Sequence, residues 1–406
     1  MIDIKKKIQC CGCEACKNIC PKSCIEMIED NEGFLYPKVD LVQCIGCNLC
    51  EKICPIINKK ERNGILDAVA FQHSNNEVRY ESASGGAFSA ISEYIIEKKG
   101  VVYGVVFSDD FEIIHTRLDN IKELKNMRGS KYVQSKIYNS YALCKEDLKA
   151  GKLVCFSGTP CQIEGLLNYL GKDYQNLLTV DLVCHGVPSP KVWKKYILDL
   201  ETKQESKIIR YSFRSKKTGY HDFGTEIHFA NGTEIYTHDK GDKKDFMHLA
   251  FFNELCSRPS CHDCAFKTLN RRSDFTLFDL WHLAEFVPQY EDDNGTSAVF
   301  AHSEKAVVIL DELMKKHRLI KIDYKKAMDL DGNNIEFSMR PNKRRAEFFL
   351  DLDKMAIDEM MTKYFGRSKK NVDLTLLKRI LKKIGIFDCT KKMVYSLSKY
   401  KNRNKI

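Results

Sequence analysis

Cysteine spacing near the N-terminus is the strongest chemical signal in this sequence. The pattern C-x2-C-x2-C-x3-C-P occurs twice, as Cys10, Cys13, Cys16 and Cys20 before Pro21 and as Cys44, Cys47, Cys50 and Cys54 before Pro55. Three thiolates on one tight loop can hold three irons of a cubane, while the fourth cysteine of each run reaches the other cluster. We therefore predict two 4Fe–4S clusters, one bound by Cys10, Cys13, Cys16 and Cys54 and the other by Cys44, Cys47, Cys50 and Cys20. Two structural zinc sites are the alternative, because four thiolates also hold zinc.

A third cysteine group lies much later in the chain and comprises Cys256, Cys261 and Cys264. Three thiolates need a fourth ligand from elsewhere to complete another cubane. Cys184 and Cys161 each lie where a predicted strand gives way to a helix; we assign Cys184 as the ligand, and Cys161 stays open. The alternatives are a zinc site completed by His262 or His282, and cysteines that bind no metal.

Three loops of small residues offer backbone N–H groups to a phosphate or a flavin. They comprise Ser84, Gly85 and Gly86; Gly129, Ser130, Lys131 and Tyr132; and Gly158, Thr159, Pro160, Cys161 and Gln162. Helix N-termini with free N–H groups bind phosphate, although Gly-Gly turns are also common without a ligand. Neither a dinucleotide fingerprint nor a Walker A motif occurs. We predict that these twelve residues bind the cofactor, and we assign no catalytic residue. His185 is either a proton donor beside a flavin or an ordinary loop histidine. Lys131 either balances the charge of a phosphate or flavin or is a solvated surface lysine.

The elements that must position these groups change in character along the chain. Residues 1–57 are short and cysteine-dense, with a predicted hairpin between the two motifs, and residues 58–64 form a polar linker. From residue 65, short apolar strands alternate with amphipathic helices, which indicates a parallel sheet with its loops at the carboxyl ends of the strands. Asn231-Gly232 predicts a later β-hairpin.

We therefore expect a mixed α+β or α/β fold in four parts. A small ferredoxin-like domain (1–57) precedes the N-terminal part (65–150) and the C-terminal part (151–340) of a larger flavin-binding domain. The C-terminal part carries FAD and the third cluster, and a basic helical tail (341–406) follows.

Charge is concentrated at the C-terminal end. Residues 367–406 hold 13 Lys/Arg and 2 Asp/Glu, a net charge of +11, so residues 1–366 contribute −1 to the total of +10. A neutral body gives no support to nucleic-acid binding. Within the tail, Leu376, Leu377, Ile380, Leu381 and Ile384 form an apolar stripe on a predicted basic helix. Such a helix either packs on the protein or contacts a membrane surface or an acidic carrier protein peripherally.

The early residues also bear on location. Lys5, Lys6 and Lys7 lead almost directly into cysteines without an apolar stretch, so we expect no secretory signal. Cysteines clustered in this way favour metal ligation in a reducing compartment over disulfides, and we expect a cytoplasmic protein. No uncharged stretch is long enough to span a bilayer.

Several of these segments, taken in order, resemble the coenzyme F420 hydrogenase/dehydrogenase beta-subunit family. They are residues 84–90, 129–135, 157–162, 184–190 and 256–264, followed by 272–277. The resemblance implies an iron–sulfur flavoprotein, with FAD in the central domain, a nearby 4Fe–4S cluster and a fused ferredoxin module. One departure is Phe278-Asp279-Leu280-Trp281-His282, where the family pattern has glycine at both ends. The missing glycines put close backbone approach there in doubt.

The function we predict is a flavin-dependent iron–sulfur oxidoreductase. Electrons from an external carrier or redox partner protein would pass through the clusters to FAD and on to a small-molecule acceptor such as deazaflavin coenzyme, or in reverse. A fused one-electron relay favours this interpretation, because hydride exchange between two organic partners needs no clusters. The alternatives are an electron-transfer subunit of a larger hydrogenase or dehydrogenase without its own substrate, and a zinc-rich interaction protein.

Overall fold

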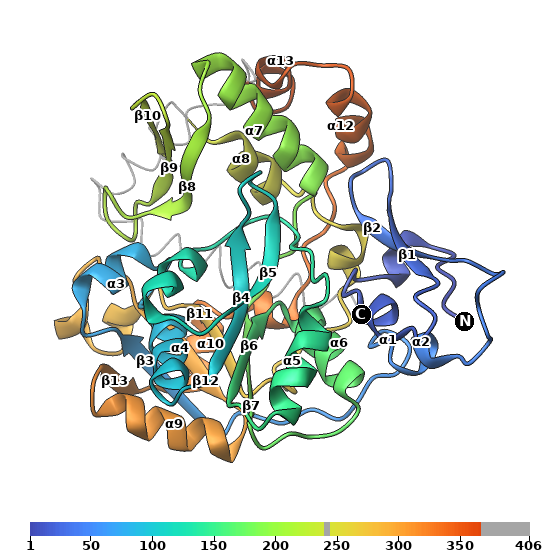
Figure 1. Ribbon diagram of the computed structural model, residues 1–406. Coiled ribbons are helices and arrows are strands. Elements are labelled where there is room, and N and C mark those ends of the chain that lie inside the picture. Colours follow the sequence, from blue (N-terminus) through green and yellow to red (C-terminus); the bar gives the residue numbers. More distant parts are fainter. Residues whose placement is uncertain (239–243, 367–406) are drawn as a thin grey trace, which may run out of the picture. The chain divides into compact units, whose positions relative to one another are not determined.

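The computed structural model describes residues 1–238 and 244–366 (Figure 1). The chain divides into two compact units, Met1–Lys354 and Met355–Ile406. The described part of the second unit contains α13 (Ile357–Met360) and the helical turn η6 (Met361–Phe365). The predicted basic helix at 376–384 lies outside the described residues. Among the helices that are described, none has the length and apolar character needed to cross a membrane.

An eight-stranded mixed sheet forms the centre of the first unit, with strand order β13-β3-β12-β11-β7-β6-β4-β5. Its strands are β3 (Asp67–Gln72), β4 (Val101–Phe107), β5 (Ile113–Leu118), β6 (Val154–Gly158), β7 (Leu177–Leu182), β11 (Phe275–Asp279), β12 (Ser297–Ala301) and β13 (Arg318–Lys321). Neighbours among β4, β6, β7 and β11 pair in parallel, and all other pairs are antiparallel. The carboxyl ends of these four parallel strands therefore meet at one edge, where open α/β sheets bind ligands.

Helices cover both faces of this sheet (Figure 1). One face packs on α4 (Ala87–Glu97), α9 (Glu304–Met314) and η2 (Ile121–Met127). The other packs on α5 (Ser140–Lys149) and α6 (Pro160–Leu170), and toward β12 on α10 (Tyr324–Leu330) and α11 (Asn333–Glu336). The mixed α/β class is confirmed, and the parallel arrangement expected from the strand–helix alternation is confined to the four central strands.

A second, three-stranded antiparallel sheet has the order β10-β9-β8. It contains β8 (Ile208–Ser215), β9 (Gly224–Phe229) and β10 (Glu234–His238), and lies beside α7 (Pro190–Gln204) and α8 (Phe246–Phe252). The Trp193 ring of α7 meets the Tyr211 ring of β8 edge-on, with centroids 4.8 Å apart. The hairpin predicted at Asn231-Gly232 is confirmed, since β9 and β10 pair antiparallel on either side of it.

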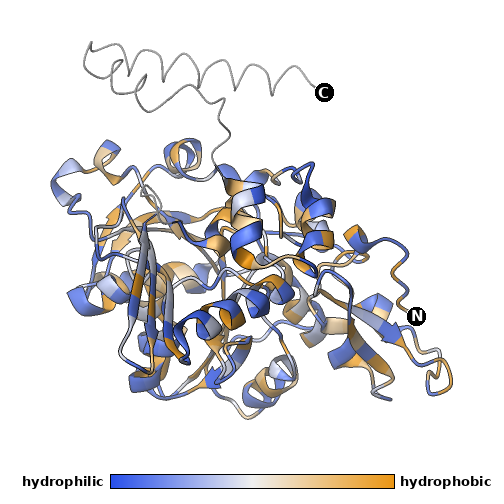
Figure 2. Ribbon diagram, turned by 90° about the horizontal axis from the view of Figure 1, so that it is seen from above, coloured by the Kyte–Doolittle hydropathy of each residue, from blue (hydrophilic) through white to orange (hydrophobic). Residues whose placement is uncertain are grey.

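The N-terminal region contains η1 (Lys7–Gln9), α1 (Ala15–Ile19), α2 (Leu49–Lys52) and the antiparallel pair β1 (Ile25–Glu29) and β2 (Leu35–Val39). The hairpin predicted between the two cysteine motifs is thus confirmed. The remaining short helices of the first unit are α3 (Asn76–Glu81), η3 (Pro259–Asp263), η4 (Leu283–Glu285), η5 (Pro288–Tyr290) and α12 (Arg345–Leu352). The finer domain boundaries inside this unit stay predictions. Hydropathy colouring shows orange and blue residues mixed along its helices (Figure 2), as expected for elements that are buried on one side.

Candidate functional site

Two cavities in the N-terminal region are each lined by five cysteines. The inner cysteine site is lined by Cys10, Cys11, Cys13, Cys16 and Cys54. The outer cysteine site is lined by Cys20, Cys24, Cys44, Cys47 and Cys50. Cys54 of the second motif thus lies with the first motif, and Cys20 of the first lies with the second. The structure brings together both predicted ligand sets and adds Cys11 and Cys24, which lie outside the repeated spacing.

The third cysteine site is a cavity lined by Cys11, Cys161, Cys184, Cys261 and Cys264. Burial, and then the neighbouring thiols of Cys184 and Cys264, raise the pKa of Cys261. Cys256 is fully buried and does not line this cavity. Burial raises the pKa of its thiol, and the charged neighbours with the next largest effects are Arg345, which lowers it, and Glu254, which raises it. Both candidates for the fourth ligand, Cys161 and Cys184, therefore belong to the group, and Cys256 stands apart from it.

The cysteine sites follow one another and end at a larger cavity. The inner site adjoins the outer one, because Cys50 of the outer site acts on the pKa of Cys16 in the inner site. Cys11 lines both the inner and the third sites. Cys184 and His185 line both the third site and the larger cavity.

The larger cavity has a volume of about 780 Å³ and opens at the carboxyl ends of β6, β7 and β11. This volume lies in the range of small-molecule and cofactor sites. Nine of the twelve residues predicted to bind the cofactor line it: Ser84, Gly86, Gly129, Ser130, Lys131, Tyr132, Gly158, Thr159 and Gln162. Pro160 and Cys161 line the third cysteine site instead, and Gly85 packs against the backbone behind the loop.

The Ser84–Gly86 loop requires its glycines. A Cβ at Gly85 would lie 2.1 Å from the carbonyl oxygen of Phe71, and Gly86 has a φ of +85°. Gly86 is the N-cap of α4 and provides no side-chain cap, while Ala87 and Phe88 line the cavity. The first N–H groups of this helix are therefore left for a ligand, and a helix N-terminus favours an anion.

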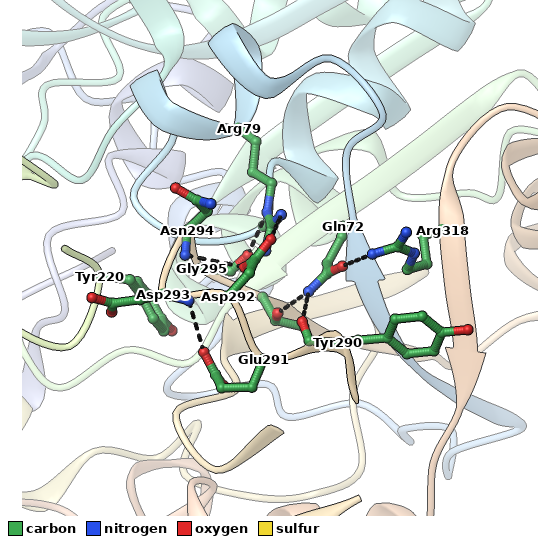
Figure 3. Close-up of polar contacts among 12 residues, drawn as sticks. Gln72, Arg79, Tyr220, Tyr290, Glu291, Asp292, Asp293, Asn294, Gly295 and Arg318 are labelled. Carbon is green, nitrogen blue, oxygen red and sulfur yellow. Dashed lines mark hydrogen bonds and ion pairs between the residues drawn. The ribbon is translucent and has the colours of Figure 1, made fainter. Parts of the chain in front are cut away.

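A charged network behind the loop holds it in place. Arg79 donates two hydrogen bonds of 2.6 Å to Asp292 and one of 2.8 Å to the carbonyl of Gly295, as the dashed lines in Figure 3 show. The Lys216 ammonium donates to the carbonyl of Ser84 at 2.7 Å. Burial lowers the pKa of Lys216 to about 7. These groups fix the backbone of the loop without entering the ligand space themselves.

Lys131 and His185 offer the cavity a cation and an imidazole. The Lys131 ammonium donates to the carbonyl of Arg128 at 3.0 Å, and burial lowers the pKa of Lys131 to about 7. His185 forms a short hydrogen bond with Glu254, and its ring meets Phe251 edge-on at 4.8 Å. A partly neutral lysine in a cavity wall becomes fully charged when an anion binds beside it.

Sequence reasoning missed several cavity residues, among them Arg214, Phe223 and Trp281. The Arg214 guanidinium lies 4.2 Å from the centre of the Phe223 ring, 4.8 Å from that of Trp281, and 3.0 Å from Asp279. The sequence of β8, which carries Arg214, contains no motif. The only sequence feature that pointed to this part of the cavity was the segment from Phe278 to His282, which departs from the family pattern.

At that departure, the two residues that replace the family's glycines behave differently. Phe278 lines the cavity and packs edge-on against Phe300 with ring centroids 5.0 Å apart. His282 points away, is half-exposed, and pairs with Asp331 at 2.6 Å.

Residues 151–326 match the family described as the C terminus of the coenzyme F420 hydrogenase/dehydrogenase beta subunit. This region of the chain belongs to that family. The matched region carries Cys161, Cys184, Cys261 and Cys264 and the loops after β6, β7 and β11, whereas the two N-terminal cysteine motifs lie outside it. Hydrogenases and dehydrogenases transfer electrons, so the chain is of oxidoreductase type.

Among solved structures, the chain is similar to one from the F420-reducing [NiFe] hydrogenase complex of Methanosarcina barkeri, studied by xenon derivatization. The identity is 15% and the TM-score 0.43, over 74% of this chain and 93% of that chain. A likeness at this level carries no functional conclusion. Comparison with curated proteins finds no match.

Proposed function

We propose that the protein is an iron–sulfur flavoprotein oxidoreductase. The observation that carries this function is the succession of the outer, inner and third cysteine sites, which ends at the large cavity with Cys184 and His185 in the shared wall. A row of thiol sites leading to a cofactor-sized cavity suits one-electron transport to a two-electron centre.

The donor sets fit 4Fe–4S clusters. Of the five cysteines that line each site, four would bind a cluster: Cys20, Cys44, Cys47 and Cys50 at the outer, Cys10, Cys13, Cys16 and Cys54 at the inner, and Cys161, Cys184, Cys261 and Cys264 at the third. Cys161 takes the place that the sequence assigned to Cys256, because Cys161 lines the third site and Cys256 does not. When bound, the clusters would carry single electrons, and a flavin would pair them for a two-electron reaction.

The large cavity fits FAD. The uncapped N-terminus of α4 and the Lys131 ammonium would hold the pyrophosphate, and Arg79 and Lys216 would keep the Ser84–Gly86 loop in the required shape. The rest of the cavity would receive an organic acceptor or donor, for which deazaflavin coenzyme is the candidate that the family description names. Phe251, Phe252 and Trp281 offer a planar molecule ring contacts there.

Redox partners would meet the protein at the outer cysteine site. Cys47 is exposed, whereas the cysteines of the inner site are buried or half-buried. The neighbouring Val42 is 95% exposed. Electrons exchanged with a carrier protein would therefore enter or leave at this end.

The test is anaerobic purification followed by counting iron, acid-labile sulfide and flavin per chain. We expect about twelve irons and one FAD, which corresponds to three cubanes and a flavin. About eight irons without flavin would contradict the proposal and leave a ferredoxin fused to another domain. A colourless protein with stoichiometric zinc would support the zinc-rich interaction protein.

The family description as a beta subunit favours a second candidate, an electron-transfer subunit that has no substrate of its own. Turnover distinguishes the two. If the purified chain alone reduces or oxidises an organic acceptor, it is an enzyme in its own right. If it does so only with a catalytic partner bound in a stable complex, the second candidate is correct.

A further inference from the structure

Arg258 lies between the inner and third cysteine sites. It is fully buried in the third cysteine group's loop, just before η3. Its backbone carbonyl accepts a hydrogen bond of 2.9 Å from the N–H of Cys261, a residue of the third site. Its guanidinium Nε donates at 2.8 Å to the carbonyl of Cys10, a residue of the inner site. One side chain thus joins two loops that are almost 250 residues apart in the sequence.

Every hydrogen-bond acceptor of the guanidinium is neutral. Besides Cys10, it donates to Gln134 Oε1 at 2.9 Å and to the carbonyl of Leu35 at 3.0 Å. Its Cζ atom lies 4.4 Å from the centre of the Tyr36 ring. Among the described residues, no carboxylate forms an ion pair with Arg258. A buried charge without a counter-charge is strongly destabilising, and arginine stays protonated even when buried.

The cysteines that could balance the charge of Arg258 lie on both sides of it, in the inner site and in the third site. The side chain of Arg258 contacts the Cys10 loop of the inner site, and its backbone carbonyl contacts Cys261 of the third site. Cysteines that bind a metal lose their protons, so a loaded site is anionic. Two thiolate-held clusters would therefore place negative charge on both sides of this guanidinium.

We propose that Arg258 is the shared counter-charge of the inner and third clusters and raises the reduction potentials of both. This inference rests on the proposed function. A nearby positive charge stabilises the more negative, reduced form of a cluster, and local charge is one of the factors that set cluster potentials. The same side chain holds the two loops in register, so the two clusters are placed and tuned by one residue. The outer cluster, without this contact, keeps its own potential.

The local sequence is shaped around this guanidinium. A Cβ at Gly12 would lie 2.6 Å from Nη1 of Arg258 and 2.5 Å from Nε2 of Gln134. Gln134 also donates to the carbonyl of Cys11 at 3.3 Å. The inner loop therefore leaves space for the arginine and receives hydrogen bonds from its partner.

The experiment is a potentiometric titration of the full chain, monitored by electron paramagnetic resonance, on the natural protein and three variants. Arg258→Met removes the charge, and Gln134→Glu keeps the arginine but gives it an adjacent carboxylate. Arg258→Lys keeps the charge and is the matched control. We expect both neutralising variants to move the inner and third midpoint potentials to more negative values. The outer potential should stay unchanged, and Arg258→Lys should shift the other two less.

Each outcome separates the possibilities. If iron content is intact and all three potentials are unchanged in either neutralising variant, the inference is overturned, and an equal shift of all three overturns it as well. If Arg258→Met does not fold, Gln134→Glu decides, because it supplies the buried guanidinium with a partner and has nearly the same shape as the natural residue. A natural protein without iron would instead contradict the proposed function.

Discussion

The two N-terminal cysteine motifs have the same spacing and nearly the same backbone. Gly12 and Gly46, which lie 34 residues apart, have φ values of +70° and +66°. Two residues later, Glu14 and Asn48 are both left-handed, at +58° and +57°, and each begins a short helix. Repeated spacing has therefore produced a repeated local loop.

The surroundings of the two loops differ completely. A Cβ at Gly12 would collide with Gln134 and Arg258, whereas nothing lies within 4 Å of the same position at Gly46. Cys13 is buried, and its counterpart Cys47 is exposed. The same local loop thus lies in a packed position in one motif and an open position in the other, and the difference comes from what packs against it.

Replacing the fourth cysteine of each motif by serine would test this comparison most directly. Because the fourth cysteine of each run lies at the other site, Cys54→Ser should remove the inner cluster and Cys20→Ser the outer one. Each variant should lose up to about four irons per chain or convert its cluster to a three-iron form. Iron analysis and spin-resonance spectra identify the affected cluster. Loss of the outer cluster in Cys54→Ser would contradict the crossed assignment.

Two further variants compare Cys161, which lines the third cysteine site, with Cys256, which does not. Cys161→Ser should lose or alter the third cluster, because Cys161 lines that cavity, while Cys256→Ser should retain about twelve irons. The measurement is iron and sulfide per chain after anaerobic purification. Iron loss in Cys256→Ser with none in Cys161→Ser would restore Cys256 as the ligand.

Alanine at the two equivalent glycines should sharpen the comparison by stability. Both variants carry the strain of a left-handed alanine, about 1–2 kcal/mol. Gly12→Ala also meets Gln134 and Arg258, which adds about 1–3 kcal/mol of overpacking and is absent at Gly46. Thermal unfolding of the iron-loaded protein should therefore show a larger loss for Gly12→Ala. Equal losses of thermal stability in the two variants would mean that the inner loop moves to accommodate the added methyl group without a further energetic cost.

The smallest effect is expected for Lys131, whose charge in the large cavity depends on its burial. Burial lowers the pKa of Lys131 to about 7, so above this pH the lysine must take up a proton to meet a phosphate. FAD affinity should fall as the pH rises above 7, by at most about tenfold per unit. Lys131→Met should bind more weakly at pH 6 and lose this dependence. Equilibrium titration of flavin fluorescence measures both, and an unchanged pH profile in Lys131→Met would exclude the lysine.

Much of the local structure could be predicted from the sequence. The hairpin around Asn231-Gly232, the hairpin between the cysteine motifs and the mixed α/β class follow from turn chemistry and from hydrophobic periodicity. Of the predicted cofactor loops, the one after β6 lines the cavity because the carboxyl ends of parallel strands share one edge, whereas the Ser84–Gly86 and Gly129–Tyr132 loops follow helices and reach the cavity through the packing of the fold. Arg214 could not be found in this way, since it lies within a strand of the second sheet without any motif.

The sequence by itself determined which cysteines share a loop, because thiols a few residues apart can meet one cluster whatever the rest of the chain does. Only the tertiary structure decided that Cys161 and not Cys256 lines a cavity with Cys184, and that Arg258 lies between two sites with no ion-pair partner among the described residues. These contacts join residues that are between 23 positions (Cys161 and Cys184) and 248 positions (Cys10 and Arg258) apart, and their meeting depends on how the sheet and its loops pack. Spacing along the chain carries no information about that packing.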